Sequence, residues 1–296
     1  MRSPSARKGA PGAAIALWGA AVACAWAGAG ACHRALDLDE PQCRADGDCV
    51  GRGFAEGAAR CVDEYCRPDE SPWSCLGRVQ LPPARGAPVP FTLRVLDASA
   101  NTPLPGATTR LCGRIDPECG EPLSAPTAAD ADGYATFAVL DTFDGYVEVE
   151  DPGFVKSLYY PQLSFFRRGG GRGPYVAIAT PATLGGLAAA NGVALDPAFG
   201  NVLLYVVDCR GRPAAGVRLE ADAAGPNTSR YYLVNRVPDR NATATDGQLG
   251  GGGFINASVG QNIFSAFVAE TGQPIARASL AVRPGLVTYA VLEPAP

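Results

Sequence analysis

An internal repeat is the feature that most constrains the fold of this chain. The segment "LRVLDASANTPLPGATTRL", which begins at Leu93, aligns with "LYVVDCRGRPAAGVRLE", which begins at Leu204. An Asp-Gly turn follows in each copy, at "DADGYATF" and at "TATDGQLGGGGF", and pairs Gly133 with Gly247. Two copies of one unit predict two similar domains, each built around its own layers of secondary structure.

The content of each copy indicates β-structure. The chain holds 36 glycines and 26 prolines, and its apolar runs are short. "FTLRVLDA" alternates, with Phe91, Leu93 and Val95 on one face, which is typical of a half-buried strand. The sequence predicts a mainly β fold of two tandem β-sandwiches. One helix is expected between them, capped by Thr180, started by Pro181 and ended at Asn191-Gly192.

The N-terminus has the pattern of a secretory signal peptide. Arg2, Arg7 and Lys8 precede an apolar run over residues 13–27, which is too short for a membrane span. Small residues then lead to Cys32, an arrangement that resembles a bacterial lipobox, in which that cysteine carries the lipid. Ala29 stands where the lipobox usually has Leu, so ordinary cleavage after Ala31 is the alternative. We expect an exported protein of the cell envelope that is anchored in the outer membrane through a lipid on Cys32. The alternative is a periplasmic or secreted protein.

Export changes the charge and predicts disulfides. Removing residues 1–31 removes three basic and no acidic residues, so the formal net charge goes from −4 to −7. The electrostatic field of such an acidic protein does not favour binding to nucleic acid. Eight cysteines remain after Cys24 and Cys32, an even number that predicts four disulfides. They are Cys43, Cys49, Cys61, Cys66, Cys75, Cys112, Cys119 and Cys209.

Spacing suggests some pairings without fixing them. Cys43–Cys61 with Cys49–Cys66 is one arrangement of the cysteine-rich segment, and Cys112–Cys119 forms a local pair. A bridge between Cys75 and Cys209 is then a hypothesis. Zinc is disfavoured, because no C-x-x-C pair exists and no histidine lies near the cluster.

These observations predict six regions along the chain. They are a signal peptide (1–31), a tether (32–42), a cysteine-rich disulfide segment (43–76), a first β-sandwich (77–180), a helical linker (181–199) and a second β-sandwich (200–296).

The repeat carries a family resemblance. The strand, the "PLPGA" return and the Asp-Gly hairpin resemble the carboxypeptidase-regulatory-like, or transthyretin-like, β-sandwich, over residues 90–180 and 200–296. The second copy has Thr245-Asp246-Gly247, one residue tighter than the family's T-D-x-x-G, and Ala129 replaces the family's Thr in the first copy. The resemblance implies Ig-like or transthyretin-like sandwiches. The whole organisation resembles exported lipoproteins of GC-rich Gram-negative bacteria.

Catalytic chemistry is not indicated. The one histidine, His33, lies on the tether, so no Ser-His-Asp, Cys-His or two-His iron site can be built. We therefore expect no enzyme, no catalytic residue, no metal and no cofactor. A carboxylate pair of the glycosidase type stays open, although no acidic pair is marked by its context. Asp130 to Gly133 is interpreted as a hairpin turn rather than a calcium site.

A binding surface is the remaining candidate. Adjacent tyrosines in a strand point to opposite faces, so one of Tyr159 and Tyr160, and one of Tyr231 and Tyr232, is expected to face outward. Ordinary edge packing is the alternative interpretation of these pairs. The leading prediction is a non-catalytic envelope lipoprotein acting in surface structure, adhesion or presentation. The alternatives are a glycan- or peptide-binding module, using those tyrosines or the loops 167–173 and 225–241, and an accessory component of an envelope assembly or export machine.

Overall fold

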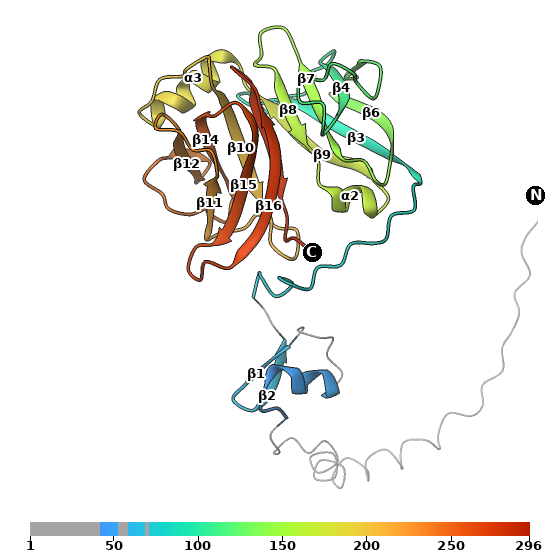
Figure 1. The fold of residues 1–296 in the computed structure, drawn as a ribbon, viewed down its shortest axis with the longest axis vertical. Helices are drawn as coiled ribbons and strands as arrows, with labels where there is room; N and C mark the ends of the chain where they lie inside the picture. Colours follow the sequence, from blue (N-terminus) through green and yellow to red (C-terminus); the bar gives the residue numbers. More distant parts are fainter. Residues whose placement is uncertain (1–41, 53–58, 69–70) are drawn as a thin grey trace, which may run out of the picture. The chain divides into compact units, whose positions relative to one another are not determined.

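The structure is a computed structural model that describes residues 42–52, 59–68 and 71–296. Two units, residues 1–70 and 71–296, are each described by themselves (Figure 1). The predicted signal peptide, Cys32 and all of the tether except Gln42 lie outside the described residues. Within the described ranges, no helix is long and apolar enough to cross a membrane.

The first unit is small and held by covalent bonds. Its described elements are the 3-10 helix η1 (Asp46–Arg52) and the antiparallel strands β1 (Ala59–Val62) and β2 (Tyr65–Pro68). Disulfides join Cys43 to Cys61 and Cys49 to Cys66. Of its described apolar side chains, only those of Cys43, Cys49 and Ala59 are buried. A core this small requires covalent support.

The second unit contains the two repeats, and the mainly β fold class is confirmed. The first repeat contributes β3 (Pro88–Asp97), β4 (Thr108–Gly113), β5 (Thr127–Ala128), β6 (Tyr134–Leu140), β7 (Gly145–Glu150), β8 (Ser157–Tyr160), α2 (Leu163–Arg167) and β9 (Gly171–Ile178). The second contributes β10 (Gly200–Val206), β11 (Val217–Ala221), β12 (Ser229–Val234), β13 (Val237–Asp239), β14 (Gly251–Ala257), β15 (Gly260–Val268), β16 (Pro274–Val282) and β17 (Val287–Leu292).

The two repeats share one topology. In the first, β3 pairs antiparallel with β6 and parallel with β9; in the second, β10 pairs antiparallel with β14 and parallel with β17. The facing sheets also agree, with the antiparallel orders β4-β7-β8 and β11-β15-β16. Each repeat is thus a sandwich of two sheets. Strand β9 of the first repeat corresponds to β17 of the second, and β8 of the first corresponds to β16 of the second. The residue limits predicted for the domains stay predictions.

One ladder joins the two sandwiches. Strand β8 pairs in parallel with β17, which makes a nine-stranded sheet of order β13-β12-β14-β10-β17-β8-β7-β4-β5. Three neighbouring strands of this sheet, β10, β17 and β8, run parallel to one another. The two sandwiches are therefore not independent domains joined only by a linker, because each supplies about half of a common sheet.

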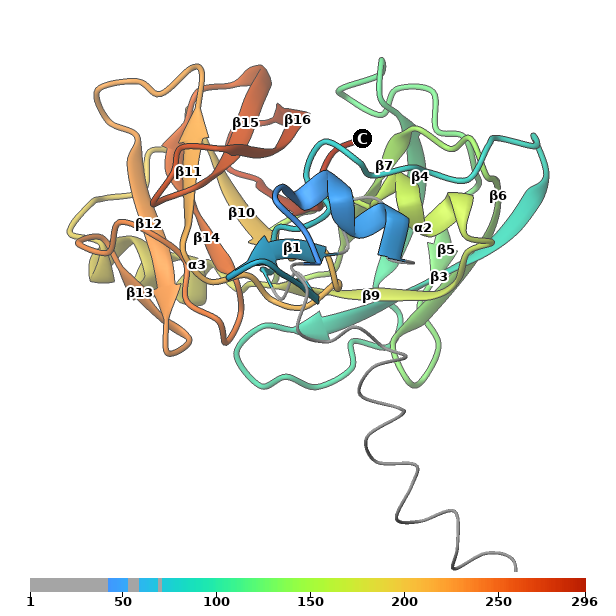
Figure 2. The ribbon, with the colours of Figure 1, turned by 90° about the horizontal axis from the view of Figure 1, so that it is seen from below.

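The two smaller sheets pack on opposite faces of this sheet. Figure 2 shows β15 and β16 above its strands β10 and β14, and β3 and β9 below its strands β4 and β7. Alternate residues of β7 follow this division, since Tyr146 belongs to the core under β15 and β16, and Val147 to the core under β3 and β6. Strands β7 and β8 are consequently buried on both faces, except at Glu150.

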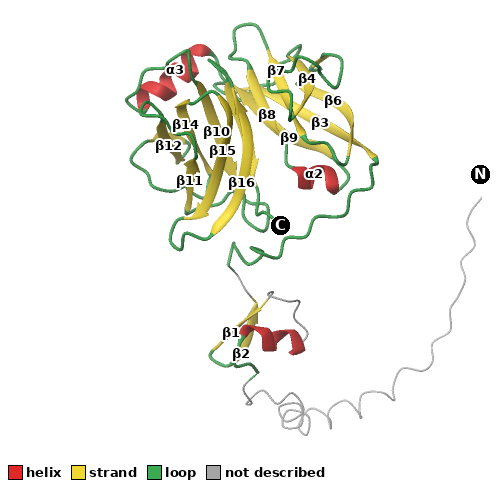
Figure 3. Cartoon of the chain, in the orientation of Figure 1, coloured by secondary structure: helices red, strands yellow, loops and turns green. Residues whose placement is uncertain are grey.

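Helix α3 (Pro181–Ala190) forms where the sequence predicted the linker helix (Figure 3). The hydroxyl of Thr180 accepts a hydrogen bond from the amide of Thr183 at 3.1 Å, and Pro181 occupies the first turn. Ala188 on α3 packs against Tyr231 and Ile255 of the nine-stranded sheet. The helix therefore covers the face of the second repeat that its own three-stranded sheet leaves open.

A corresponding turn differs from the sequence alignment. The amide of Val95 donates to the carbonyl of Gly133 at 2.8 Å, and its counterpart Val206 donates to Gly250 at 2.8 Å. Gly133 and Gly250 have φ of +79° and +61°, and an added Cβ would lie 2.6 and 2.4 Å from the carbonyl oxygens of Val95 and Val206. The pairing of Gly133 with Gly247 is therefore wrong. The second turn is longer, and glycine is required at its end.

Candidate functional site

The four tyrosines predicted to form a binding surface are buried. Tyr159, Tyr160, Tyr231 and Tyr232 are 2%, 3%, 2% and 0% exposed, so the prediction is wrong. Alternation along a strand exposes one side chain in two only when one face of the sheet meets solvent. Both faces of the nine-stranded sheet are covered at these positions, as described for β8 and α3.

The second tyrosine of each pair anchors the facing sheet. The hydroxyl of Tyr160 accepts a hydrogen bond from the amide of Ala281 at 3.0 Å, and that of Tyr232 accepts one from Leu219 at 3.0 Å. Ala281 lies on β16, the free edge of the second repeat, and its carbonyl accepts a bond from the hydroxyl of Thr288 at 2.8 Å. Tyr160 of the first repeat and Thr288 of the second thus occupy the two backbone groups through which β16 would pair with another strand at this residue.

The eight remaining cysteines form four disulfides. Besides the two bridges of the first unit, Cys75 bonds to Cys209 and Cys112 to Cys119. The Cys75–Cys209 bridge closes a separation of 134 residues, for which chain entropy gives a stabilisation of roughly 5 kcal/mol. The sulfurs of Cys43, Cys49 and Cys66 lie within 4.8 Å of one another, but each belongs to a disulfide and is not free to hold a metal.

The turn at Asp130 has a structural explanation. Its carboxylate accepts hydrogen bonds from the amides of Asp132 and Tyr134 at 3.0 and 2.8 Å, and Gly133 supplies the positive φ. One oxygen of Asp130 therefore caps the hairpin itself.

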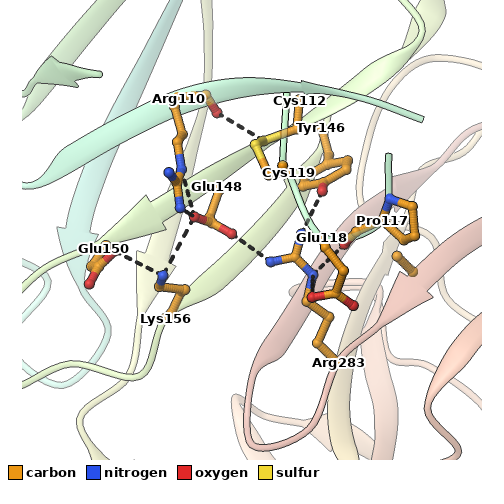
Figure 4. A network of polar contacts seen from close by, with 12 residues as sticks. Arg110, Cys112, Pro117, Glu118, Cys119, Tyr146, Glu148, Glu150, Lys156 and Arg283 are labelled. Carbon is orange, nitrogen blue, oxygen red and sulfur yellow. Dashed lines mark hydrogen bonds and ion pairs between the residues drawn. A yellow bond between two sulfur atoms is a disulfide. The ribbon is translucent and has the colours of Figure 1, made fainter. Parts of the chain in front are cut away.

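A buried network of charges lies where the repeats meet (Figure 4). Glu148 on β7 is 2% exposed and accepts a hydrogen bond from Arg283, which follows β16, at 2.6 Å. Its other oxygen accepts one from the Nε of Arg110 at 2.7 Å and lies 3.6 Å from the ammonium of Lys156. Arg283 also donates to the hydroxyl of Tyr146 at 2.6 Å. One carboxylate thus connects strands of the first repeat to the end of β16.

The chemistry of Glu148 is that of a fixed anion. Burial alone would raise the pKa of its carboxyl group, but hydrogen bonds from Arg110 and Arg283 and the charge of Lys156 hold that pKa below its usual value. A carboxylate held ionised among three cations is unsuited to donating or accepting protons near neutral pH. The network is therefore a structural junction.

The open candidate site is a groove with a volume of about 670 Å³, which is within the range of small-ligand pockets, about 300–1,000 Å³. It adjoins the carboxyl ends of the three parallel strands, with Gln162 after β8, Asp208 after β10 and Glu293 after β17. Its lining also includes the Cys75–Cys209 bridge. Parallel strands end at the same edge of a sheet, and this brings polar residues from distant parts of the sequence together.

Two aromatic rings line the groove. Tyr175 lies on β9, an edge strand of its sheet, and is 56% exposed, whereas Tyr205 on β10 is half-buried. Burial, with the nearby Tyr175 as a second cause, raises the pKa of Tyr205 to about 12, so this phenol stays protonated. Among the described residues, neither phenol hydroxyl has a hydrogen-bond partner. Both can therefore donate and accept bonds with a ligand.

The polar groups of the groove are balanced in charge. Glu293 is held by Ser164, whose amide and hydroxyl donate to its two oxygens at 3.3 and 2.5 Å. Asp208 is held by the guanidinium of Arg212 and by backbone amides, and its pKa is lowered by these bonds although burial acts to raise it. Arg168 and Arg210 also line the groove and supply two cations. The formal charge of the lining residues is zero, and Arg212 beside Asp208 adds one positive charge.

Sequence reasoning missed most of this groove. The loop 167–173, which contains Arg168, was predicted as a binding element, but Tyr175, Tyr205 and Glu293 were assigned only to strands. Their meeting depends on the β8–β17 ladder, which leaves no local mark in the sequence. The only local pattern was a single tyrosine, Tyr175, that follows the glycine-rich run "GGGRG" (169–173).

Comparisons with known proteins add little to this description. No family model and no curated protein match the chain. The Bacillus anthracis TIE protein is a structural match at 11% identity and a TM-score of 0.24, over 71% of this chain and 34% of that chain, so this protein spans about a third of its length. The shaft pilin SpaA from Lactobacillus rhamnosus GG matches at 12% identity and a TM-score of 0.23, over 71% of this chain and 99% of that one.

A third structure gives the same result. The minor pilin GBS52 from Streptococcus agalactiae matches at 15% identity and a TM-score of 0.21, over 70% of this chain and 98% of that one. TM-scores this low do not establish a shared topology. The transthyretin-like resemblance stays a prediction.

Proposed function

We propose that this chain is a non-catalytic protein of the cell envelope, in which the fused sandwiches form a rigid structural or adhesive body. The observation that carries the proposal is the junction, where the β8–β17 ladder and the Arg283–Glu148 pair join the repeats into one sheet. The Cys75–Cys209 bridge adds a covalent restraint. Disulfides persist in the oxidising environment outside the cytoplasm, so the bridge would keep its restraint there.

Lack of catalysis is supported by the chemistry of the chain. Its one histidine is His33, outside the described residues, and Glu148 is ionised and enclosed by cations. Both carboxylates of the groove are bound to neighbouring donors. The pKa of Asp208 is held below its usual value, away from the near-neutral value that general acid–base catalysis favours.

Envelope anchoring is proposed through Cys32 and is tested on the full-length precursor. Expressed in a Gram-negative host, the membrane-bound protein should have an intact mass that starts at Cys32 and includes acyl chains. The variant Cys32→Ser should lose the acyl mass and leave the membrane fraction, and Cys24→Ser is the matched control that should keep both. A wild-type protein without acyl chains in the soluble fraction would contradict the anchor.

Surface display is a separate measurement. Protease added to intact cells should degrade the wild-type protein if it faces the medium, and an internal periplasmic marker should stay intact. Degradation only after the outer membrane is opened would place the protein in the periplasm. That outcome would contradict an adhesive role and favour a component of an assembly machine.

A further inference from the structure

We propose that the groove at the carboxyl ends of β8, β10 and β17 is a binding site for a neutral oligosaccharide. This proposal adds a ligand class to the proposed function. It rests on that function only for the location, the cell envelope, in which the protein would encounter the ligand. Binding is measured on purified protein, so failure of the anchor and failure of this site give separate results.

The balance of charge narrows the ligand class. Two carboxylates and two guanidiniums line the groove, and Arg212 beside Asp208 adds one cation, so the excess is a single charge and no cluster of cations is present to select a nucleic acid or a polyanionic glycan. Two amide side chains, those of Gln80 and Gln162, add further donors and acceptors. A mixed set of this kind matches a ligand whose groups both donate and accept, and sugar hydroxyls do so.

The rings provide the other half of a sugar site. A sugar presents apolar C–H groups on one face, and an exposed aromatic ring gives them a flat apolar partner at a low cost in side-chain entropy. Tyr175 is an exposed ring of this kind, and Tyr205 lies beside it in the same groove. Their free hydroxyls extend the polar set to the edge of the stacking surface.

The rigidity of the polar groups favours a specific site. Glu293 receives one hydrogen bond on each oxygen from Ser164, which fixes its orientation and leaves lone pairs for a ligand. Among the described residues, the side chain of Arg168 has no hydrogen-bond or ion-pair partner and is exposed at the groove, so its guanidinium is available to a bound hydroxyl. Groups that are held before binding lose less entropy when a ligand arrives.

The test is isothermal titration of the purified mature chain, disulfides intact, with neutral hexasaccharides of glucose, xylose, mannose and N-acetylglucosamine. At least one should bind, and Tyr175→Ala should weaken that binding by roughly tenfold. Tyr134→Ala is the matched control, because Tyr134 is also partly exposed but lies on β6 outside the groove lining. It should bind as the wild type does. Circular dichroism should show that both variants are folded, although Tyr134→Ala also removes the contacts of the ring with Arg94 and Arg172.

Two further variants separate stacking from hydrogen bonding. Tyr175→Phe should keep most of the affinity, because the ring remains, and Glu293→Gln should lose part of it. The proposal is overturned if no neutral hexasaccharide binds at millimolar concentration, or if Tyr175→Ala binds as well as the wild type. It is also overturned if only a proline-rich decapeptide or an oligogalacturonate binds with the same dependence on Tyr175.

Discussion

Tyr159 of β8 and Tyr289 of β17 are register partners in the parallel ladder that joins the two repeats. Both rings are buried, at 2% and 5% exposure. The hydroxyl of Tyr159 is buried and has no hydrogen-bond partner in the described part of the chain, whereas that of the next residue, Tyr160, accepts a bond from the amide of Ala281. Two adjacent tyrosines thus enter opposite cores, and only one of the pair has its hydroxyl satisfied.

This difference predicts opposite effects of one chemical change. Tyr160→Phe removes the acceptor of the buried Ala281 amide and should lower the free energy of unfolding by about 1–3 kcal/mol. Tyr159→Phe removes a hydroxyl that has no partner and should leave that free energy unchanged or raise it. Urea unfolding of the unreduced protein measures both. Equal losses from the two variants would contradict the assigned environments.

The Arg283–Glu148 pair should couple the repeats energetically. Arg283→Met leaves Glu148 buried with less compensation and should cost about 3–5 kcal/mol. The double variant Arg283→Met/Glu148→Leu removes both charges and should recover much of this loss. The partly exposed pair Arg218–Glu220 is the control, since Arg218→Met should cost less than about 1 kcal/mol. A double variant as unstable as the sum of its single variants would show that the pair does not act as a unit.

The same carboxylate predicts a pH dependence. The folded-state pKa of Glu148 is below its unfolded value of about 4.3, so its stabilising contribution is present above that value. The contribution is lost as the pH falls through the folded-state pKa. The stability difference between wild type and Glu148→Gln should therefore be largest at neutral pH and shrink in acid. Thermal unfolding from pH 7 to pH 3 tests this, and a gap that grows in acid would contradict it.

The corrected turn alignment gives a paired glycine test. Gly250→Ala should destabilise the protein by at least about 1–2 kcal/mol, because φ is positive and the added Cβ meets the carbonyl of Val206. Gly247→Ala should have little effect, because its nearest neighbour is a side-chain carbon at 3.7 Å and its φ is not positive. Denaturant midpoints of the two variants decide the matter. The reverse order of stability would restore the sequence alignment of Gly247 with Gly133.

Local patterns predicted the local structure well. The repeat, the linker helix with its Thr180 cap and the hairpin at Asp130 all rest on residues close in sequence, where turn chemistry and capping dominate. The prediction of the corresponding turn in the second repeat was wrong because the Asp-Gly pair at Asp246 is a strong turn signal, but it lies inside a longer turn that ends at Gly250. Spacing cannot show which glycine must approach a carbonyl of a neighbouring strand.

The junction and the groove could not be predicted in the same way. Whether a strand faces solvent depends on what covers it, and Tyr159, Tyr160, Tyr231 and Tyr232 are covered by elements distant in the sequence. Glu148 and Arg283 are 135 residues apart, and each is an ordinary charged residue in its own segment. Their pairing follows only after β8 and β17 are placed side by side.

Hydrogen exchange across the β8–β17 ladder tests the central claim most directly. Under native conditions, amides of β8 and β17 bonded within this ladder should exchange as slowly as those of the inner strands β10 and β14. Strand β9, the counterpart of β17 that remains an edge, should exchange faster along its open side. If these ladder amides of β8 and β17 instead exchange as fast as those on the open side of β9, the two sandwiches are not fused and the account of a single rigid body is wrong.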